Sequence, residues 1–262
     1  MAEGYSTMGD GCRIAWRDDG PRGALPLILS NSLGTTMDMW EPQIESFSAK
    51  YRVVRYDTRG HGVSDVPAGG YGLDRLGRDV LELADALEIE HFAFCGLSLG
   101  GMTGQWLGVR ASARVERLVI ANSSPYMGPP SDWDSRIKFV LSKGMNAIAE
   151  SVLSRWFTPD VLRRPDRIRN YEAMLLATNP AGYAGCCAAI RDMDMRPVLG
   201  LIEVPTLVIG GSRDPATPPN HTEQLSAAII GARCVMLDAA HLSNAEVPGD
   251  FASAVIKHLD EA

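Results

Sequence analysis

The chain has 262 residues, of which 45% are hydrophobic, and its 25 Lys and Arg against 32 Asp and Glu give a net charge of −7. A chain of this length buries about 70 to 75% of its unfolded surface, so it needs no disulfide or metal to hold a core. The acidic balance, without any block of Lys and Arg, argues against nucleic acid as a partner, because that binding depends on clustered cations.

Six short apolar segments are typical of buried strands. Each lacks the alternation of polar and apolar residues that a half-exposed strand would show. These segments are residues 26–30, 52–56, 92–95, 117–121, 205–210 and 233–237. Between them lie stretches with helical periodicity, such as 73–87 and 244–259. The alternation predicts an α/β protein with a mostly parallel central sheet and helices on both of its faces.

This alternation stops between residues 124 and 196, where the segment is rich in Met, Arg and Trp and has helical patterning. We interpret the segment as a helical lid, inserted after one strand and lying over the edge of the sheet. Residues 1–123 and 197–262 then form the core of the same domain. No internal repeat or flexible linker suggests a further unit.

The five cysteines are odd in number and lack the CxxC spacing of a zinc or redox site. The sequence also lacks the ~18 to 20 consecutive apolar residues of a membrane span, and residues 1–12 lack the pattern of a secretory signal. We therefore expect a cytoplasmic protein with free thiols, no metal and no membrane partner.

Residues 92–101 combine an apolar strand with the sequence Gly96-x-Ser98-x-Gly100, and a helix-compatible stretch follows. This is the strand-turn-helix context of a nucleophile elbow, in which the backbones approach so closely that only glycine fits two residues before and after the serine. The backbone N–H of Leu99, at the start of the new helix, would point toward a developing oxyanion. The pattern predicts that Ser98 attacks a carbonyl carbon.

Two alternatives exist for this motif: an incidental serine in a glycine-rich turn, and a dinucleotide-binding loop. The second alternative is disfavoured because Ser98 replaces a needed glycine. In addition, the next strand leads to Asn122 rather than to a ribose-binding acid.

In this architecture the histidine and the acid follow the nucleophile, each at the carboxyl end of a later strand. Only His241 directly follows a predicted strand, whereas His221 and His258 fall in helical stretches. Asp214 follows the strand that precedes the one leading to His241. Asp238 is a weaker alternative for the acid, because it lies on the same strand as the histidine. Ser98, His241 and Asp214 would form a catalytic triad, in which His241 takes the serine proton and Asp214 orients the imidazole.

With these residues in place, the chain resembles the α/β-hydrolase superfamily over essentially its whole length, and within it the 3-oxoadipate enol-lactonases. The segments that carry the likeness are 31–35 (Asn-Ser-Leu-Gly-Thr), 56–64, 96–102, 132–137 and 211–214. The resemblance implies that the backbone N–H of Leu33 joins that of Leu99 in an oxyanion hole. It also implies that Arg59 and His61 brace neighbouring loops.

The resemblance further implies a small anionic enol lactone as substrate, opened by the triad in aromatic catabolism without a cofactor or metal. In the lid, Trp133 would flank the lactone ring and Arg136 would bind the carboxylate, with Trp156, Lys138 and Arg191 as lesser options. The alternative is that Trp133 belongs to the lid core and Arg136 is a solvated helix residue.

Three other functions stay open at this point. The first is a related enzyme: a carboxylesterase, a cofactor-free perhydrolase or haloperoxidase-like enzyme, or a carbon-carbon bond hydrolase. The second is a ligand receptor that turns its ligand over slowly and signals through the lid. The third is a structural protein with a decayed site, which the three filled triad positions disfavour.

Overall fold

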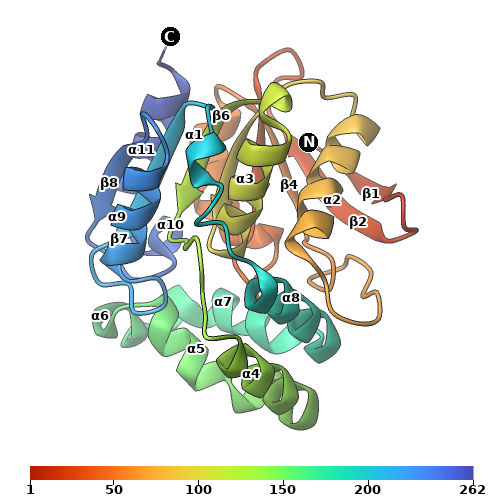
Figure 1. Cartoon of the computed structure of the whole chain (residues 1–262), viewed down its shortest axis with the longest axis vertical. Coiled ribbons are helices and arrows are strands. Elements are labelled where there is room, and N and C mark those ends of the chain that lie inside the picture. Colours follow the sequence, from red (N-terminus) through yellow and green to blue (C-terminus); the bar gives the residue numbers. More distant parts are fainter. Residues whose placement is uncertain (262) are drawn as a thin grey trace.

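The strands of the computed structural model, which describes residues 1–261, form one eight-stranded sheet in the order β1-β2-β4-β3-β5-β6-β7-β8 (Figure 1). Strands β3 to β8 pair in parallel, whereas β2 pairs antiparallel with both β1 and β4. The bounds are β1 (Ala2–Thr7), β2 (Arg13–Asp19), β3 (Pro26–Ser30), β4 (Arg52–Tyr56), β5 (Phe92–Leu97), β6 (Val115–Ala121), β7 (Thr206–Gly211) and β8 (Arg233–Leu237). The predicted mostly parallel sheet is confirmed.

The six strands predicted from apolar runs are all present, but the sequence analysis missed β1 and β2. These two strands form an antiparallel pair at one edge of the sheet, where alternate residues of β1 are exposed. Strand β2 contains charged residues at both of its ends, so it lacks the apolar run that identified the other strands. One of them, Asp18, is buried in an ion pair with Arg52 of β4, at 2.8 Å.

Helices cover both faces of the sheet, as predicted (Figure 1). Helix α2 (Leu73–Ala86) packs against α3 (Leu99–Arg110) on one face, and α1 (Glu41–Ser48) packs against α11 (Pro248–Leu259) on the other. The other elements of the core are α9 (Pro219–Ala228), α10 (Ser243–Glu246) and the short 3-10 helices Met37–Trp40, Ser112–Arg114 and Leu199–Leu201. The predicted helix over 244–259 is divided in two, because Pro248 begins a new helix.

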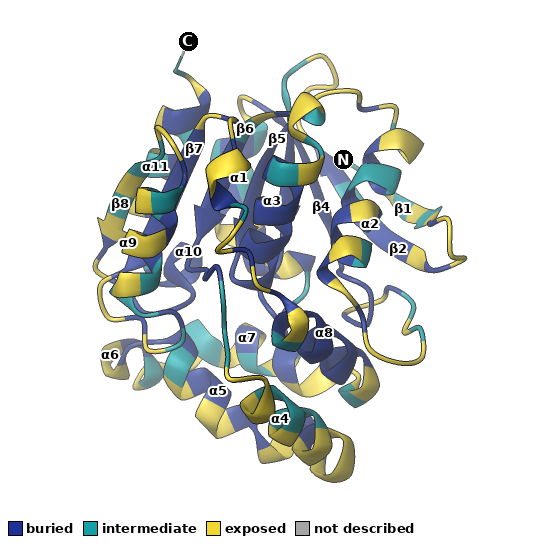
Figure 2. Cartoon of the chain, in the orientation of Figure 1, coloured by how far each residue is buried: buried dark blue, intermediate teal, exposed yellow. Residues whose placement is uncertain are grey.

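Five helices between β6 and β7 lie across the carboxyl ends of the parallel strands (Figure 1). We call this segment the lid: α4 (Pro130–Lys143), α5 (Ala149–Trp156), α6 (Pro159–Leu162), α7 (Pro165–Ala177) and α8 (Pro180–Asp192), with the 3-10 helix Met145–Ala147. Figure 2 shows that α8 is mostly buried, whereas the outer side of α4 is exposed.

One of the contacts between the lid and the core is made by two glycines. A Cβ atom on Gly182 of α8 would lie 2.1 Å from the carbonyl oxygen of Gly60, which belongs to the turn after β4. Only two glycines allow the two backbones to approach this closely.

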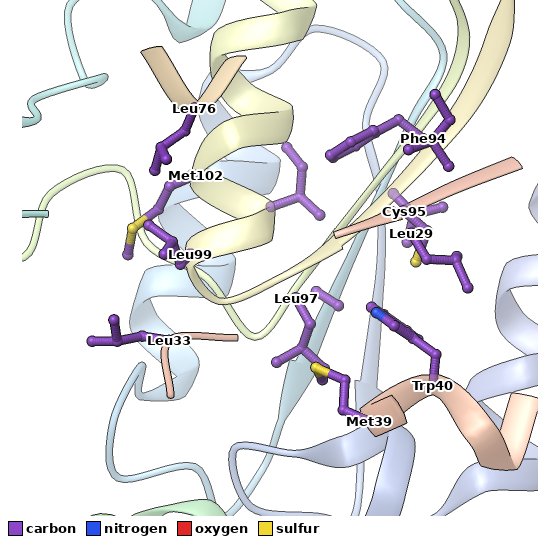
Figure 3. Packing of buried hydrophobic residues seen from close by; sticks show 14 of the residues in the cluster. Leu29, Leu33, Met39, Trp40, Leu76, Phe94, Cys95, Leu97, Leu99 and Met102 are labelled. Carbon is purple, nitrogen blue, oxygen red and sulfur yellow. The ribbon is translucent and has the colours of Figure 1, made fainter. Parts of the chain in front are cut away.

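The hydrophobic core surrounds β5, the strand that leads to Ser98. Figure 3 shows side chains of this core, among them Phe94 and Leu97 on β5 and Met102 on α3. Phe94 and Leu97 are fully buried, and Trp40 packs among the same cluster. The residue after β5 is therefore held by a densely packed scaffold.

Within the described residues, no single helix is long and apolar enough to cross a membrane. Helices α7 and α8 satisfy the length and composition criteria only as a pair, and the chain bends by 93° between them.

Candidate active site

Ser98 lies in the sharp turn between β5 and α3, with φ 58° and ψ −111°, a conformation that residues with a side chain rarely adopt. The flanking glycines make the turn possible. A Cβ atom on Gly96 would lie 2.1 Å from the carbonyl oxygen of Gly100, and one on Gly100 would lie 2.1 Å from that of Ser30. The hydroxyl of Ser123 donates to the carbonyl oxygen of Ser98 at 2.8 Å and helps to hold the turn.

His241 and Asp214 follow β8 and β7, and both are buried. Nδ1 of His241 lies 2.8 Å from Oδ2 of Asp214. The backbone N–H groups of Ala216 and Thr217 donate to the other carboxylate oxygen, and the Thr217 hydroxyl donates to Oδ2 at 2.7 Å. Burial alone would raise the pKa of Asp214, but the charge of His241 and the hydrogen bonds from His241, Asn122 and the backbone N–H of Thr217 outweigh it and lower the pKa below its ordinary value.

Asn122 is a member of this network that the sequence analysis did not identify. Its backbone adopts φ 42°, and its amide Nδ2 donates to Oδ2 of Asp214 at 3.0 Å and to the carbonyl oxygen of Ala240 at 3.2 Å. Its Oδ1 accepts a hydrogen bond from Ser243 at 2.5 Å. Asn122 thus connects Asp214 to the segment that carries His241. The sequence analysis looked only for a carboxylate at the end of β6, and an amide gave no such signal.

Glu246 is a second residue that the sequence analysis did not identify. It is buried, and its Oε2 accepts a hydrogen bond from the backbone N–H of Ala240 at 2.8 Å. Its Oε1 accepts from the backbone N–H of Thr158 at 3.2 Å and from the Thr158 hydroxyl. The carboxylate therefore links the loop before His241 to the segment between α5 and α6 of the lid. No local sequence pattern marks this contact, because its partners lie far apart in the chain.

Ser98 and His241 line the same cavity, which lies between the core and the lid. Its other lining residues are Ser32, Leu33, Met102, Met127, Trp133, Arg136, Val152, Arg155, Trp156, Tyr183, Ile190, Ala216 and Thr217. The structure thus brings the predicted nucleophile and base to one cavity wall, and Asp214 lies directly behind the base.

The two predicted oxyanion donors lie on adjoining segments. Leu33 belongs to the loop after β3, whose Asn31 carbonyl oxygen accepts a hydrogen bond from the N–H of Gly100 at 3.0 Å. Leu99 is the first residue of α3, where backbone N–H groups have no partner within the helix. Among the hydrogen bonds of residues 1–261, none is donated by the backbone N–H of Leu33 or Leu99. Both groups are therefore available to a ligand.

Arg59 and His61 lie behind this loop rather than in the cavity. Arg59 forms an ion pair with Asp79 at 2.5 Å. Nε2 of His61 accepts a hydrogen bond from the backbone N–H of Gly34 at 3.0 Å. Burial lowers the pKa of His61 to about 4, so its imidazole is neutral at pH 7. Both residues brace loops next to the site.

The lid residues Trp133 and Arg136 both line the cavity. The indole N–H of Trp133 donates to the carbonyl oxygen of Met127 at 2.8 Å, so this side chain also packs within the lid. Nε of Arg136 donates to the Tyr183 hydroxyl at 3.0 Å, and its guanidinium lies 5.6 Å from the ring centroids of both Trp133 and Tyr183. Arg136 is thus held by aromatic rings.

The three lesser candidates for substrate binding occupy different environments. Trp156 lines the cavity and is buried. Arg191 forms ion pairs with Asp134 and Asp192, and Lys138 is exposed outside the cavity. The described residues 1–261 contain no group of three His, Cys, Asp or Glu side chains that could hold a metal ion.

Comparisons with known proteins show the family of this fold. A family model of the alpha/beta hydrolase fold matches residues 26–248. The chain is 40% identical to 3-oxoadipate enol-lactonase 2 of Acinetobacter baylyi, over 97% of this chain and 92% of that protein. A solved hydrolase from Pseudomonas aeruginosa is 48% identical, with a TM-score of 0.97, over 99% of this chain and 98% of the other. The enol-lactonase of Burkholderia xenovorans is 42% identical, with a TM-score of 0.96, over 98% of this chain and 100% of the other. The chain therefore belongs to the α/β-hydrolase family, and within it to the group that contains the 3-oxoadipate enol-lactonases.

Proposed function

We propose that the protein is a serine hydrolase that converts 3-oxoadipate enol-lactone to 3-oxoadipate in the catabolism of aromatic compounds. The observation that carries this proposal is the shared cavity, in which Ser98 and His241 face a lid arginine, Arg136. The name of the relative from Acinetobacter baylyi supports the same substrate, and the name of the protein from Burkholderia xenovorans supports an enol lactone as the substrate class. The buried free thiols of Cys12, Cys95, Cys186 and Cys187 suit the reducing cytoplasm, where we place the protein.

In the first step, Oγ of Ser98 attacks the lactone carbonyl carbon while Nε2 of His241 accepts the serine proton. Asp214 holds Nδ1 of His241 as the donor toward its own carboxylate, which leaves Nε2 free to act as the base. The oxyanion that forms accepts hydrogen bonds from the backbone N–H groups of Leu33 and Leu99. Preorganised donors of this kind stabilise the tetrahedral intermediate, because they need no reorientation as the charge develops.

The ring then opens when the bond between the carbonyl carbon and the ring oxygen breaks. The leaving oxygen is that of an enolate, and His241 returns the proton to it. The enol becomes a ketone, so it does not readily close the ring again. Water, activated by His241, then attacks the acyl group on Ser98 and releases the second carboxylate.

The lid would orient the substrate. In this arrangement the ring of Trp133 flanks the lactone, and the guanidinium of Arg136 binds the carboxylate of the carboxymethyl group. An arginine held against two aromatic rings is well suited to this, because less side-chain freedom is lost when the anion binds.

The proposal is tested by following the ultraviolet absorbance of the enol lactone, generated in situ from its upstream muconolactone. Wild type is compared with Ser98→Ala, and with Ser154→Ala as a control for an exposed lid serine. We expect rapid loss of the lactone with wild type and the control, and a loss of orders of magnitude in rate with Ser98→Ala. If wild type leaves the lactone untouched but hydrolyses neutral aryl esters, the protein is a carboxylesterase on this frame and the substrate assignment is wrong.

A further inference from the structure

Two cavity arginines lack an acidic partner, although the protein has more acidic than basic residues. Arg136 of α4 and Arg155 of α5 both line the cavity. Within residues 1–261, neither guanidinium has a carboxylate oxygen within 4.0 Å, whereas Arg191 of the lid forms two ion pairs. An arginine left unpaired at the wall of a cavity is in a position to bind an anion that enters it.

The position of Arg155 is fixed by its own helix. Its Nε donates to the carbonyl oxygen of Ser151, one turn earlier, at 3.0 Å. Its neighbours Val152 and Trp156 are buried and line the same cavity. Hence Arg155 adds its positive charge to the α5 side of the cavity wall, while Arg136 adds its own from α4.

The two positive charges also act on each other. Burial lowers the pKa of Arg155, and the charge of Arg136 lowers it further. Two like charges at a partly desolvated wall repel each other. A carboxylate bound between the two guanidinium groups would attract both of them and so offset this repulsion. The cavity wall is therefore electrostatically prepared for an anion.

We propose that Arg155 is a second specificity-determining residue, which binds the substrate carboxylate together with Arg136. This proposal rests on the proposed function, because it assigns a further residue to the same substrate. A carboxylate has two oxygens and about four acceptor sites, so it can receive donors from α4 and α5 at once. The two arginines together would favour a lactone with a carboxylate over a neutral ester of the same size.

The experiment measures kcat/KM for the enol lactone and for a neutral aryl ester, such as 4-nitrophenyl acetate. The variants are Arg155→Gln, Arg155→Lys and Arg136→Gln. We expect Arg155→Gln to lower the ratio of the two kcat/KM values, lactone over ester, by about 10- to 100-fold, as the loss of a charge-assisted hydrogen bond would. Arg155→Lys should restore part of the ratio because it keeps the charge.

The matched control is Arg169→Gln, which removes a positive charge from an exposed lid position outside the cavity. It should leave the ratio unchanged. If Arg155→Gln lowers both values equally, Arg155 acts only on the structure of the lid, and the proposal is wrong. It is equally wrong if neither value changes.

A second measurement separates this proposal from the proposed function. Adipate, a stable dicarboxylate, and its neutral analogue adipamide are tested as inhibitors of aryl ester hydrolysis. We expect adipate to inhibit wild type more strongly than adipamide, and Arg155→Gln to weaken inhibition by adipate at least 10-fold. If wild type ignores the enol lactone but this pattern holds, the proposed function fails and the anion site stands. If the lactone is hydrolysed but adipate inhibits wild type and Arg155→Gln equally, the proposal for Arg155 is wrong and the proposed function stands.

Discussion

Nδ2 of Asn122 lies 3.0 Å from Oδ2 of Asp214, the same carboxylate oxygen that faces Nδ1 of His241. The segment after β6 thus supplies a neutral donor to the predicted triad, and the segment after β7 supplies its acid. The donor stabilises the ionised form of Asp214, and it is one of the causes that lower the pKa of this carboxyl. Asn122 is therefore a positioning residue, acting on His241 through Asp214.

The variant Asn122→Ala should weaken both the site and the fold. Asp214, the Ala240 carbonyl and the Ser243 hydroxyl would each lose a partner, so we expect a loss of about 1 to 3 kcal/mol in the free energy of unfolding. We expect kcat to fall by about 10-fold, since one such hydrogen bond to a charged group is lost. Urea denaturation and ester hydrolysis measure the two effects, with exposed Asn146→Ala as the control. Full activity in Asn122→Ala would contradict the positioning role.

His61 predicts a pH dependence of stability. Its pKa is about 4 in the folded chain against 6.5 as the ordinary value, so the unfolded chain binds the proton first as pH falls. This contribution to stability is fully present above pH 6.5 and is lost progressively as pH falls to about 4, for a total of about 3 kcal/mol. His61→Gln cannot titrate there, so its free energy of unfolding should fall less than that of wild type between pH 7 and pH 4.

The comparison is made by urea denaturation at several pH values, with His91→Gln as the matched control because His91 is exposed. The control should follow the wild-type curve. A His61→Gln curve parallel to that of wild type would show that His61 does not carry this pH dependence.

The backbone conformation of Ser98 predicts that relieving its strain would raise the free energy of unfolding, although the serine hydroxyl would be lost. The φ and ψ values of this residue are rare for a side-chain-bearing residue but accessible to glycine, and such strain costs about 1 to 3 kcal/mol. Ser98→Ala keeps the strain, whereas Ser98→Gly relieves it at the cost of a more flexible unfolded chain. We expect Ser98→Gly to exceed Ser98→Ala in free energy of unfolding by about 1 kcal/mol. Equal free energies of unfolding for Ser98→Gly and Ser98→Ala, in the same denaturant titration, would argue against strain at this turn.

The close contact between Gly60 and Gly182 predicts that a larger residue at position 182 would displace the lid from the core. In Gly182→Ala the new Cβ atom would overlap with the Gly60 carbonyl oxygen, so α8 must shift. We expect a loss of about 1 to 3 kcal/mol in stability and a higher KM. Gly249→Ala is the control, because no atom lies within 4 Å of its new Cβ atom, and it should be neutral or slightly stabilising. A normal KM in Gly182→Ala would mean that this contact does not set the lid position.

The sequence predicted best where local physics decides the structure. The glycines around Ser98 and the apolar runs of β3 to β8 are such cases, because a tight turn and a doubly buried strand each leave a pattern within a few residues. Strands β1 and β2 were missed because they lie at an edge and carry charges whose partners are distant in sequence. Asn122, Arg155 and Glu246 were missed for a related reason: their roles depend on contacts that only the folded chain creates.

The buried Glu246 joins the lid to the loop that leads to His241. One of its carboxylate oxygens accepts a hydrogen bond from the backbone N–H of Ala240, and the other accepts from Thr158 in the segment between α5 and α6. A displacement of this part of the lid would therefore move the backbone next to His241 through a single buried carboxylate. The position of the proposed base is thus coupled mechanically to the position of the lid.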